Sequence, residues 1–478
     1  MKDFSYYLNE LHEFGIVTQI NHPIVVVSGL PKAKLHEIVL FETGQKGQIF
    51  SLHPQHVEIL LLSREKILVG TKLVRTNHPL SVAMGEGLLG HTINPLGGDL
   101  GNNPIIFSNL SVEREIDEKP LGIPYRARIK KPFQTGTIIV DMLTPLGKGQ
   151  KELIIGDRKT GKSSFLFTTI KNQILSGSIA IYAVIGKQKS DIKHIQEFIK
   201  KENLTDRSVI VATASNDSPG LIYLTPFTAM TIAEYFRDLG EDVLLVIDDL
   251  TTHARFYREI SLLVKNFPGR DSYPGDIFYI NAKLLERAGN FIHPKKGEVA
   301  ITCLPVVETI EGDITNYIVT TLMGITDGHI FFDSNIFYNG RRPAVNTSLS
   351  VTRVGKQTQS QVERSITREL NSFFTLYDKM QNLSHFGAEL TENVKNILTM
   401  GDKINLFFEQ HYSIIVPREV RLIVFSLLWI RLIDPDKNML DTICKVFLEA
   451  FEKNTEVQQL FNEIVQVNTF NELLAMCQ

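Results

Sequence analysis

Residues 152–175 read ELIIGDRKTGKSSFLFTTIKNQIL, and this stretch decides the fold of the central part of the chain. A short apolar segment typical of a strand leads through a loop that fits G-x-x-x-x-G-K-[ST] into a segment of helical composition. In that arrangement the backbone N–H groups of the loop and the N-terminus of the helix bind phosphate. We expect Lys162 to reach the β- and γ-phosphates of a nucleotide and the Ser163 hydroxyl to ligate Mg²⁺. The residues of the predicted phosphate loop are Gly156, Asp157, Arg158, Lys159, Thr160, Gly161, Lys162 and Ser163.

A second acidic element lies downstream of this loop. Residues 243–247 (VLLVI) predict a buried strand that ends in Asp248 and Asp249. A carboxylate at the end of the strand beside a phosphate loop is the usual second anchor of Mg²⁺, and we assign that role to Asp248. The alternative is that the two acids cap the helix predicted to begin near Thr251, a role that suits Asp249.

Hydrolysis also needs a group that activates the attacking water, commonly a carboxylate near the γ-phosphate. The strand predicted after the phosphate-loop helix, IAIYAVIG, is followed by Lys187, and the first acid comes only at Asp191. A lysine favours an anionic nucleotide but cannot act as the base. The residues therefore predict a site that binds Mg-nucleotide and hydrolyses it poorly, unless Asp191 or Glu234 supplies the base.

Three regions of different pattern make up the chain. Short β-rich runs at regular spacing predict a small β-barrel or sandwich over residues 15–76. Apolar strands then alternate with helical patterns, which predicts a parallel sheet covered by helices. Helix formers dominate the last part. We therefore predict a multidomain protein with an N-terminal β-barrel domain (residues 1–78), a central α/β P-loop nucleotide-binding domain (residues 79–360) and a C-terminal α-helical bundle (residues 361–478).

Composition and charge exclude several classes of protein. With 43% hydrophobic and 22% charged residues, the chain is neither disordered nor fibrous. Fifty Lys and Arg against 53 Asp and Glu leave a net charge of −3, so no basic excess points to a nucleic-acid partner. Three cysteines are too few for a disulfide framework or a zinc site. The most apolar stretch, residues 422–433, contains Arg431 and is too short to span a membrane, so we expect a soluble chain with a buried helix there.

Long stretches of the sequence resemble the alpha subunits of F-type ATP synthases. The resemblance covers nearly the whole chain from about Gly15 and includes the GDRxTGK form of the phosphate loop. It implies a barrel, a RecA-like nucleotide-binding domain and a helical domain, in that order. The stretches that carry it are PFQTGTIIVDMLTPLGKGQKELIIGDRKTGKSS (132–164), VIDDLTTHARFYREISLL (246–263), FPGRDSYPGDIFYINAKLLERA (267–288), LPVVETIEGDITNYI (304–318), ITDGHIFFDSNIFYNGRRPAVNTSLSVTRVG (325–355) and HFGAEL (385–390).

The resemblance also bears on the missing base. Catalytic beta subunits of this family carry Glu directly after the glycine that matches Gly186, and alpha subunits, whose sites are non-catalytic, carry Gln. This chain has Lys187, which is neither. Residues 350–355 match the stretch of the family's arginine finger, so the resemblance implies that Arg353, with Ser350 in the same loop, acts in the catalytic site of the neighbouring beta subunit. Without the resemblance, a surface salt bridge is the simpler role for Arg353.

The segments that contact adenine in this family match the sequence only in part. Phe337, Arg342 and Pro343 match the family's FYxGxRP segment, which flanks the adenine of the alpha-site nucleotide. The family also contacts adenine through two glutamines of a QxQYS stretch. Here the sequence is EQHYS, with Glu409 and His411 at those positions, so both glutamines are replaced unless the register shifts by one.

Two further segments match regions that contact other subunits. The N-terminal stretch SYYLNELHEF is shorter than the family's docking helix, so it is either a reduced docking helix for the delta subunit or a frayed terminus. The resemblance places HFGAEL near the rotating gamma subunit.

The resemblance implies a regulatory, non-catalytic subunit that binds ATP or ADP with Mg²⁺ and alternates with beta subunits in a ring of three pairs. We expect gamma and delta or peripheral-stalk subunits as further partners. The complex would lie at the cytoplasmic face of the cell membrane and couple ATP synthesis or hydrolysis to proton or sodium transport. Two alternatives remain: a specialised F-type-like ATPase with a modified stalk, and a homohexameric P-loop motor.

Overall fold

The computed structural model describes residues 3–100, 112–385, 391–433, 445–451 and 453–478, with the backbone alone for residues 382–385. The chain forms two compact units, and each is described by itself. The first consists of Met1–Arg128, Ile174–Thr309 and Asp313–Thr326, and the second of Ile129–Gln173, Ile310–Gly312 and Asp327–Gln478. The three-domain boundaries proposed above stay a prediction.

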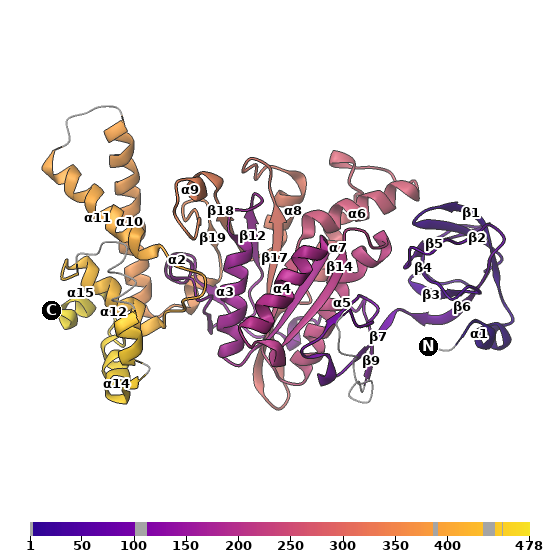
Figure 1. Ribbon diagram of the computed structural model, residues 1–478, viewed down its shortest axis with the longest axis horizontal. Helices are drawn as coiled ribbons and strands as arrows, with labels where there is room; N and C mark the ends of the chain where they lie inside the picture. Colours follow the sequence, from indigo (N-terminus) through magenta and orange to yellow (C-terminus); the bar gives the residue numbers. More distant parts are fainter. Residues whose placement is uncertain (1–2, 101–111, 386–390, 434–444, 452) are drawn as a thin grey trace. The chain divides into compact units, whose positions relative to one another are not determined.

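The N-terminal strands of the first unit close into a barrel, which confirms the barrel prediction (Figure 1). Alternate residues such as Val17, Val39 and Ile59 point inward and are fully buried, because strand side chains alternate between faces. The barrel order is β1-β2-β5-β4-β3-β6. The strands are β1 (Gly15–Asn21), β2 (Ile24–Ser28), β3 (Glu37–Phe41), β4 (Lys46–Leu52), β5 (Val57–Leu61) and β6 (Lys72–Pro79).

A short helix precedes the barrel. The helix α1 (Phe4–Leu11) begins at Asp3, whose side chain accepts a hydrogen bond from the backbone N–H of Tyr6 at 2.9 Å. Tyr7 packs with Leu40 and Val74 of the barrel. The N-terminal segment is therefore a capped helix held on the barrel surface.

A parallel sheet forms the α/β part of the first unit, with the order β17-β15-β13-β14-β8. The strands β13 and β14 are buried along almost their whole length, as a sheet covered on both faces requires. Helix α5 packs across β13, β14 and β15. The strands are β7 (Ser81–Met84), β8 (Thr92–Ile93), β9 (Val112–Glu115), β13 (Ile179–Lys187), β14 (Ser208–Ala214), β15 (Val243–Asp248), β16 (Gly289–His293) and β17 (Gly297–Glu308). The helices are α4 (Lys189–Lys201), α5 (Pro219–Asp238), α6 (Leu250–Leu263), α7 (Ile277–Leu285) and α8 (Tyr317–Ile325).

The second unit holds the strand of the phosphate loop. Strand β12 (Glu152–Gly156) pairs in parallel with β18 (Gly328–Phe332), and β18 pairs in antiparallel fashion with β19 (Val351–Thr352). The loop leads into α3 (Lys162–Leu175), which confirms the predicted strand–loop–helix order. The other elements before the C-terminal helices are β10 (Pro132–Phe133), α2 (Ile138–Leu143), β11 (Leu146–Gly147) and α9 (Ser334–Tyr338).

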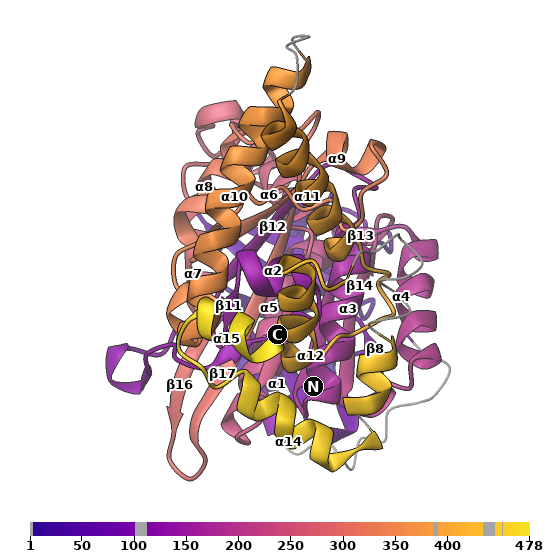
Figure 2. The ribbon, with the colours of Figure 1, turned by 90° about the vertical axis from the view of Figure 1, so that its left-hand side faces the viewer.

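The C-terminal part of the second unit is helical, as predicted. The long helices α10 and α11 lie side by side (Figure 2). Residues 422–429 of the apolar stretch lie in α12 and are largely buried, with aromatic contacts from Phe425 and Trp429 to Phe470. Residues 430–433 lie beyond the helix and Leu432 is 61% exposed, so the buried helix is shorter than predicted. No helix in the described ranges is long and apolar enough to cross a membrane. The helices are α10 (Gln361–His385), α11 (Glu392–Phe408), α12 (Arg418–Trp429), α14 (Thr455–Ile464) and α15 (Phe470–Cys477).

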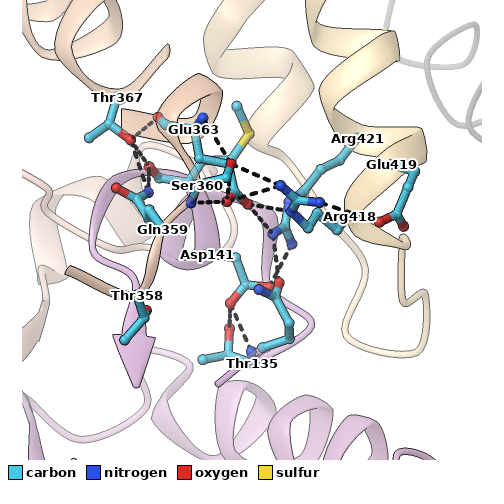
Figure 3. Close-up of polar contacts among 12 residues, drawn as sticks. Thr135, Asp141, Thr358, Gln359, Ser360, Glu363, Thr367, Arg418, Glu419 and Arg421 are labelled. Atoms are coloured by element: carbon cyan, nitrogen blue, oxygen red, sulfur yellow. Dashed lines mark hydrogen bonds and ion pairs between the residues drawn. The ribbon is translucent and has the colours of Figure 1, made fainter. Parts of the chain in front are cut away.

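A buried network of charges ties α12 to the segment that precedes the phosphate loop (Figure 3). The Arg421 guanidinium donates to Asp141 of α2 at 2.8 Å and to Gln134 Oε1 at 2.6 Å. Both charged side chains are at most 2% exposed. Burial is the main reason that the pKa of Asp141 is raised, and the charge of Arg421 opposes that shift. Because removal of one partner from such a pair costs about 3–5 kcal/mol, the network fixes the packing of α12 on α2.

Candidate functional site

The predicted phosphate loop connects β12 to α3 within the second unit. Gly161 has a φ of 97°, a left-handed conformation that glycine adopts without strain. A Cβ atom on Gly156 would lie 2.6 Å from the carbonyl oxygen of Phe332, so the close approach of loop and strand requires glycine. The ammonium group of Lys162 donates to the carbonyl oxygens of Gly156 and Asp157, each at 2.6 Å. Lys162 is thus held over the loop itself, at the first turn of α3.

Asp157 fixes the conformation of the loop. Its Oδ1 accepts from the Gly312 N–H at 3.0 Å, and its Oδ2 accepts from the Ser334 hydroxyl at 2.6 Å. The Thr160 hydroxyl donates to the Asp157 carbonyl oxygen at 2.8 Å. The motif did not reveal this role, because the two side-chain partners of Asp157 lie 155 and 177 positions further along the chain.

Arg158, Lys159 and Ser163 are the exposed members of the loop. Within the described part of the chain, the Ser163 hydroxyl has no hydrogen-bond partner, and it lies in the first turn of α3, where the helix dipole favours phosphate. A free hydroxyl at this position suits a ligand of Mg²⁺. Ser163 therefore fits the metal role expected for it.

The predicted adenine-flanking residues lie at the end of α9 and just after it. The Arg342 guanidinium lies over the Phe337 ring, 4.6 Å from its centroid. Phe337 and Pro343 are half-buried, whereas Arg342 is exposed. A stacked arginine on an aromatic ring gives a flat, partly apolar surface of the kind that receives a base.

Gln410 connects this segment to the residues before the phosphate loop. Its side-chain oxygen accepts from the Ile138 N–H at 2.9 Å, and its amide nitrogen donates to the Gly136 and Ile414 carbonyl oxygens at 2.7 and 2.6 Å. These backbone contacts occupy the Gln410 side chain, so a register shift by one does not supply an adenine-binding glutamine. Next to it, the Tyr412 carbonyl oxygen accepts from Thr168 of α3 at 2.8 Å. The EQHYS stretch therefore lies against the phosphate-loop helix.

The two predicted residues of the finger stretch differ in exposure. Arg353 follows β19 and is exposed, and its N–H donates to the Asp327 carbonyl oxygen at 3.1 Å. Its guanidinium forms no ion pair with any described carboxylate within the usual 4 Å, so the surface salt bridge considered above is absent there. Ser350 is buried, and its hydroxyl donates to the Asn346 carbonyl oxygen at 2.6 Å and accepts from the Phe331 N–H at 3.0 Å. Ser350 thus ties the loop to β18.

Lys187 and Asp248 lie in the first unit, at the ends of the neighbouring parallel strands β13 and β15. The Lys187 ammonium forms an ion pair of 2.5 Å with Asp248 Oδ1, and the Tyr182 hydroxyl donates to Asp248 Oδ2 at 2.9 Å. Burial by itself would lower the pKa of Lys187, but Asp248 and Asp249 outweigh burial and the pKa is raised. Lys187 therefore stays charged, and both oxygens of the Asp248 carboxylate are already engaged. Asp248 would give up the Lys187 contact in order to ligate Mg²⁺ through that oxygen, so its metal role stays a prediction.

Other acids surround this ion pair. Asp249 caps α6 by accepting from the Thr252 N–H at 2.6 Å, which confirms the cap proposed for it. Burial is the main reason that the pKa of Asp249 is raised, to about 6, and the Asp248 charge adds to it. Glu308, at the end of β17, is a further negative charge beside Lys187. The sequence reasoning missed Glu308, although it follows a buried strand as Asp248 does.

Glu234 and Asp191, the two residues considered as alternative catalytic bases, differ in their surroundings. Glu234 is 4% exposed and is held by Arg287 through two hydrogen bonds of 3.1 and 2.5 Å. A carboxylate in such a buried bidentate pair is not available to a water at a phosphate. Asp191 is exposed in the first turn of α4, where a negative charge is stabilised by the helix N-terminus. Residues 386–390 of the HFGAEL stretch lie outside the described residues.

Comparison with known proteins agrees with the strand–loop–helix unit and with the barrel and helical region around it. A sequence model of the ATP synthase alpha/beta family, nucleotide-binding domain, matches residues 136–352. The chain is 39% identical to ATP synthase subunit alpha of Carsonella ruddii over 83% of its own length and 84% of the relative's. It is 39% identical to ATP synthase subunit alpha 2 of Nitrosospira multiformis, over 90% and 84% of the two chains. It is 38% identical to ATP synthase subunit alpha of Petrotoga mobilis, over 88% and 84%. With this identity along almost the whole chain, the protein belongs to the alpha subunits of the ATP synthase alpha/beta family.

Proposed function

We propose that this chain is the regulatory, non-catalytic subunit of a rotary ATP synthase, which binds a nucleotide and supplies Arg353 to the catalytic site of a neighbouring beta subunit. The ion pair between Lys187 and Asp248 is the observation that carries the proposal. It puts a permanent cation where a catalytic subunit has its base. The charge favours a bound polyphosphate and cannot accept a proton from water.

The buried environment of Glu234 supports the same reading. Its bidentate pairing with Arg287 argues against Glu234 as the alternative catalytic base. Asp191 is exposed at the start of α4, beyond the strand end at which the family carries its base. A homohexameric motor needs base and finger in one chain, and these contacts disfavour it.

In the proposed nucleotide site, the phosphate loop binds the phosphates. The Phe337–Arg342 stack, with Pro343, contacts the adenine ring. Lys162 would exchange its loop carbonyls for β- and γ-phosphate oxygens. Mg²⁺ bound with the nucleotide would be held by Ser163 and would neutralise phosphate charge. Glu409 and His411 replace the two glutamines, so the adenine ring is held from one side only, by the Phe337 segment.

Arg353 is proposed as the arginine finger because it is exposed and lacks an ion-pair partner among the described residues. An arginine without a carboxylate partner on its own chain is available to a phosphate in a neighbouring subunit. The loop that bears it is anchored by the buried Ser350 hydroxyl. The proposal gives Ser350 a positioning role, one step removed from the phosphate.

The complex that we propose is a ring of three alpha and three beta subunits with a gamma subunit at its centre and delta or peripheral-stalk subunits attached. It lies at the cytoplasmic face of the cell membrane and couples ATP synthesis or hydrolysis to proton or sodium transport. The departures at Lys187, Glu409 and His411 favour, as a second candidate, an F-type-like ATPase with a modified stalk. Mass spectrometry of the subunits that co-purify in mild detergent separates the two, because only a standard synthase brings delta and membrane-ring subunits.

The isolated chain provides the direct test of the non-catalytic assignment. We expect it to bind a fluorescent ATP analogue and to hydrolyse ATP with a kcat far below about 1 s⁻¹, the lower end for ordinary enzymes. Lys162→Ala should weaken binding by more than about tenfold, since it removes a charged phosphate contact. Lys130→Ala, at an exposed lysine outside the phosphate loop, is the control and should bind as the wild type does. Turnover at ordinary rates by the chain alone would contradict the proposal.

A further inference from the structure

Two histidines and a glutamate, none of them used above, lie together on the hairpin formed by β4 and β5. The hairpin register pairs Ser51 with Glu58 and Leu52 with Val57. Because side chains alternate along a strand, His53 and His56 continue the face of Ser51 and Glu58. Val57 is buried on the opposite face, in the barrel core. The fold thus gathers three potential metal ligands on the outer face of one hairpin, at its turn end.

The spacing of the ligand atoms is close to that of a metal site. One nitrogen from each imidazole and one Glu58 oxygen all lie within 4.8 Å of one another. His53 Nε2 is 3.2 Å from Glu58 Oε2. Two ligands on a tetrahedral Zn²⁺ with bonds of about 2.0–2.1 Å lie roughly 3.3 Å apart. The His53–Glu58 pair already has this separation, and the widest pair needs to close by at most about 1.5 Å, which rotation of an imidazole supplies.

The two imidazole rings are stacked, with centroids 4.5 Å apart and planes 20° from parallel. Two protonated rings would repel each other in this position, whereas two neutral rings can both turn a nitrogen toward one cation. The hairpin also limits the freedom of the ligands, since the His53 N–H donates to the His56 carbonyl oxygen at 3.0 Å. The exposed fraction falls from 39% for the His53 side chain to 12% for Glu58, so the carboxylate is partly desolvated.

We propose that His53, His56 and Glu58 form a binding site for a divalent transition-metal ion, of which Zn²⁺ is the best match. Two imidazoles and one carboxylate suit Zn²⁺, whereas Mg²⁺ and Ca²⁺ prefer an all-oxygen set. Three protein ligands leave the fourth position to water or to a ligand from another molecule. The Ser51 hydroxyl, 3.0 Å from His53 Nε2, gives up this contact when the metal binds. The site is independent of the nucleotide site, because its ligands belong to the barrel alone.

Metal binding by the full chain without an affinity tag tests this proposal. We expect one Zn²⁺ per chain in competition with a chromophoric chelator, and Co²⁺ should give the visible absorption bands of a four-coordinate site. His53→Ala and Glu58→Gln should each weaken binding by about tenfold or more and abolish the Co²⁺ bands. His194→Ala, at an exposed histidine of α4, is the control and should keep one Zn²⁺ per chain.

Two measurements make the outcome decisive. The melting temperature without metal shows whether each variant is folded, and nucleotide binding shows whether the rest of the chain is intact; we expect both to match the wild type. Absence of stoichiometric Zn²⁺ from the wild type overturns the proposal. Equal Zn²⁺ affinity in His53→Ala, Glu58→Gln and the wild type overturns it as well. Equal weakening in His194→Ala would place the metal elsewhere and reject the hairpin site.

Discussion

Lys187 places a permanent positive charge beside the Asp248 carboxylate. The ion pair with Asp248 and the hydrogen bond from Tyr182 occupy both oxygens of that carboxylate. A lysine ammonium and a hydrated Mg²⁺ both neutralise a carboxylate, but the lysine is attached to the chain. At the residue scale, the chain therefore carries its own counter-charge to the Asp248 carboxylate.

Lys187→Gln should make nucleotide binding more dependent on Mg²⁺. In the wild type we expect chelation of Mg²⁺ to weaken ATP binding only a few-fold, because the Lys187 charge remains. In the variant the same treatment should weaken it by about tenfold or more, the size of one charge-assisted contact. Titration calorimetry with and without EDTA measures both effects.

Lys189→Gln is the matched control for this experiment, since Lys189 is exposed two positions further along and begins α4. It should respond to EDTA as the wild type does. If Lys187→Gln and the wild type lose the same affinity on chelation, the Lys187 charge does not substitute for the metal.

His253 couples helix α6 to helix α5 in the first unit. Its ring is fully buried, its Nε2 lies 3.0 Å from the Tyr223 carbonyl oxygen, and it stacks on the Tyr223 ring at 5.3 Å between centroids. Burial lowers the pKa of His253 to about 4, from an ordinary value of 6.5. At the scale of elements, the contact between the two helices thus requires a neutral imidazole.

Stability should therefore fall as the pH drops from about 6.5 to about 4. In this window the unfolded chain binds a proton at His253 and the folded chain does not, so the free energy of unfolding decreases with decreasing pH. The full loss from this group is about 3 kcal/mol. Urea unfolding at a series of pH values measures it.

A shallower pH slope is expected for His253→Gln, which cannot titrate. His194→Gln, on the exposed face of α4, should keep the slope of the wild type. An unchanged slope in His253→Gln would show that other groups cause the acid sensitivity.

At the scale of the whole molecule, the sites discussed above lie in different segments of the chain. The barrel presents the His53 hairpin, the phosphate loop lies in the second unit with the C-terminal helices, and Lys187 with Asp248 lies in the first. Arg353 is exposed and free of ion pairs among the described residues, so its proposed task involves another subunit. That task can be tested only in the assembled complex.

Arg353→Ala in a complex reconstituted with cognate beta and gamma subunits should lower the ATPase rate by about 10³-fold or more, the usual worth of an arginine finger. Arg353→Lys should recover only part of the rate, because an ammonium lacks the planar fork of a guanidinium. Lys356→Ala, at an exposed lysine of the same segment, should leave the rate unchanged. A rate for Arg353→Ala within about threefold of the wild type would reject the finger role.

Several features of the fold and site were predictable because they depend on neighbours in the sequence. The phosphate loop between β12 and α3 follows from a contiguous motif, and the Asp249 cap follows from residues three positions apart. The anchoring of Asp157 by Ser334 and the pairing of Glu234 with Arg287 could not be predicted. These partners lie 177 and 53 positions apart, and no local pattern marks them.

The sequence by itself determined the order of barrel, nucleotide-binding part and helical part, the position of the phosphate loop and the presence of a lysine, Lys187, directly after Gly186. Periodicity and motif spacing are local properties, and backbone geometry converts them directly into strands, loops and helices. Only the tertiary structure decided the partners of the charged side chains. It paired Lys187 with Asp248, enclosed Glu234 beside Arg287, committed Gln410 to backbone groups and gathered the His53 ligands on one hairpin face. The physical reason is that a buried charge or amide must find a partner in space, and the folded chain supplies that partner from distant positions.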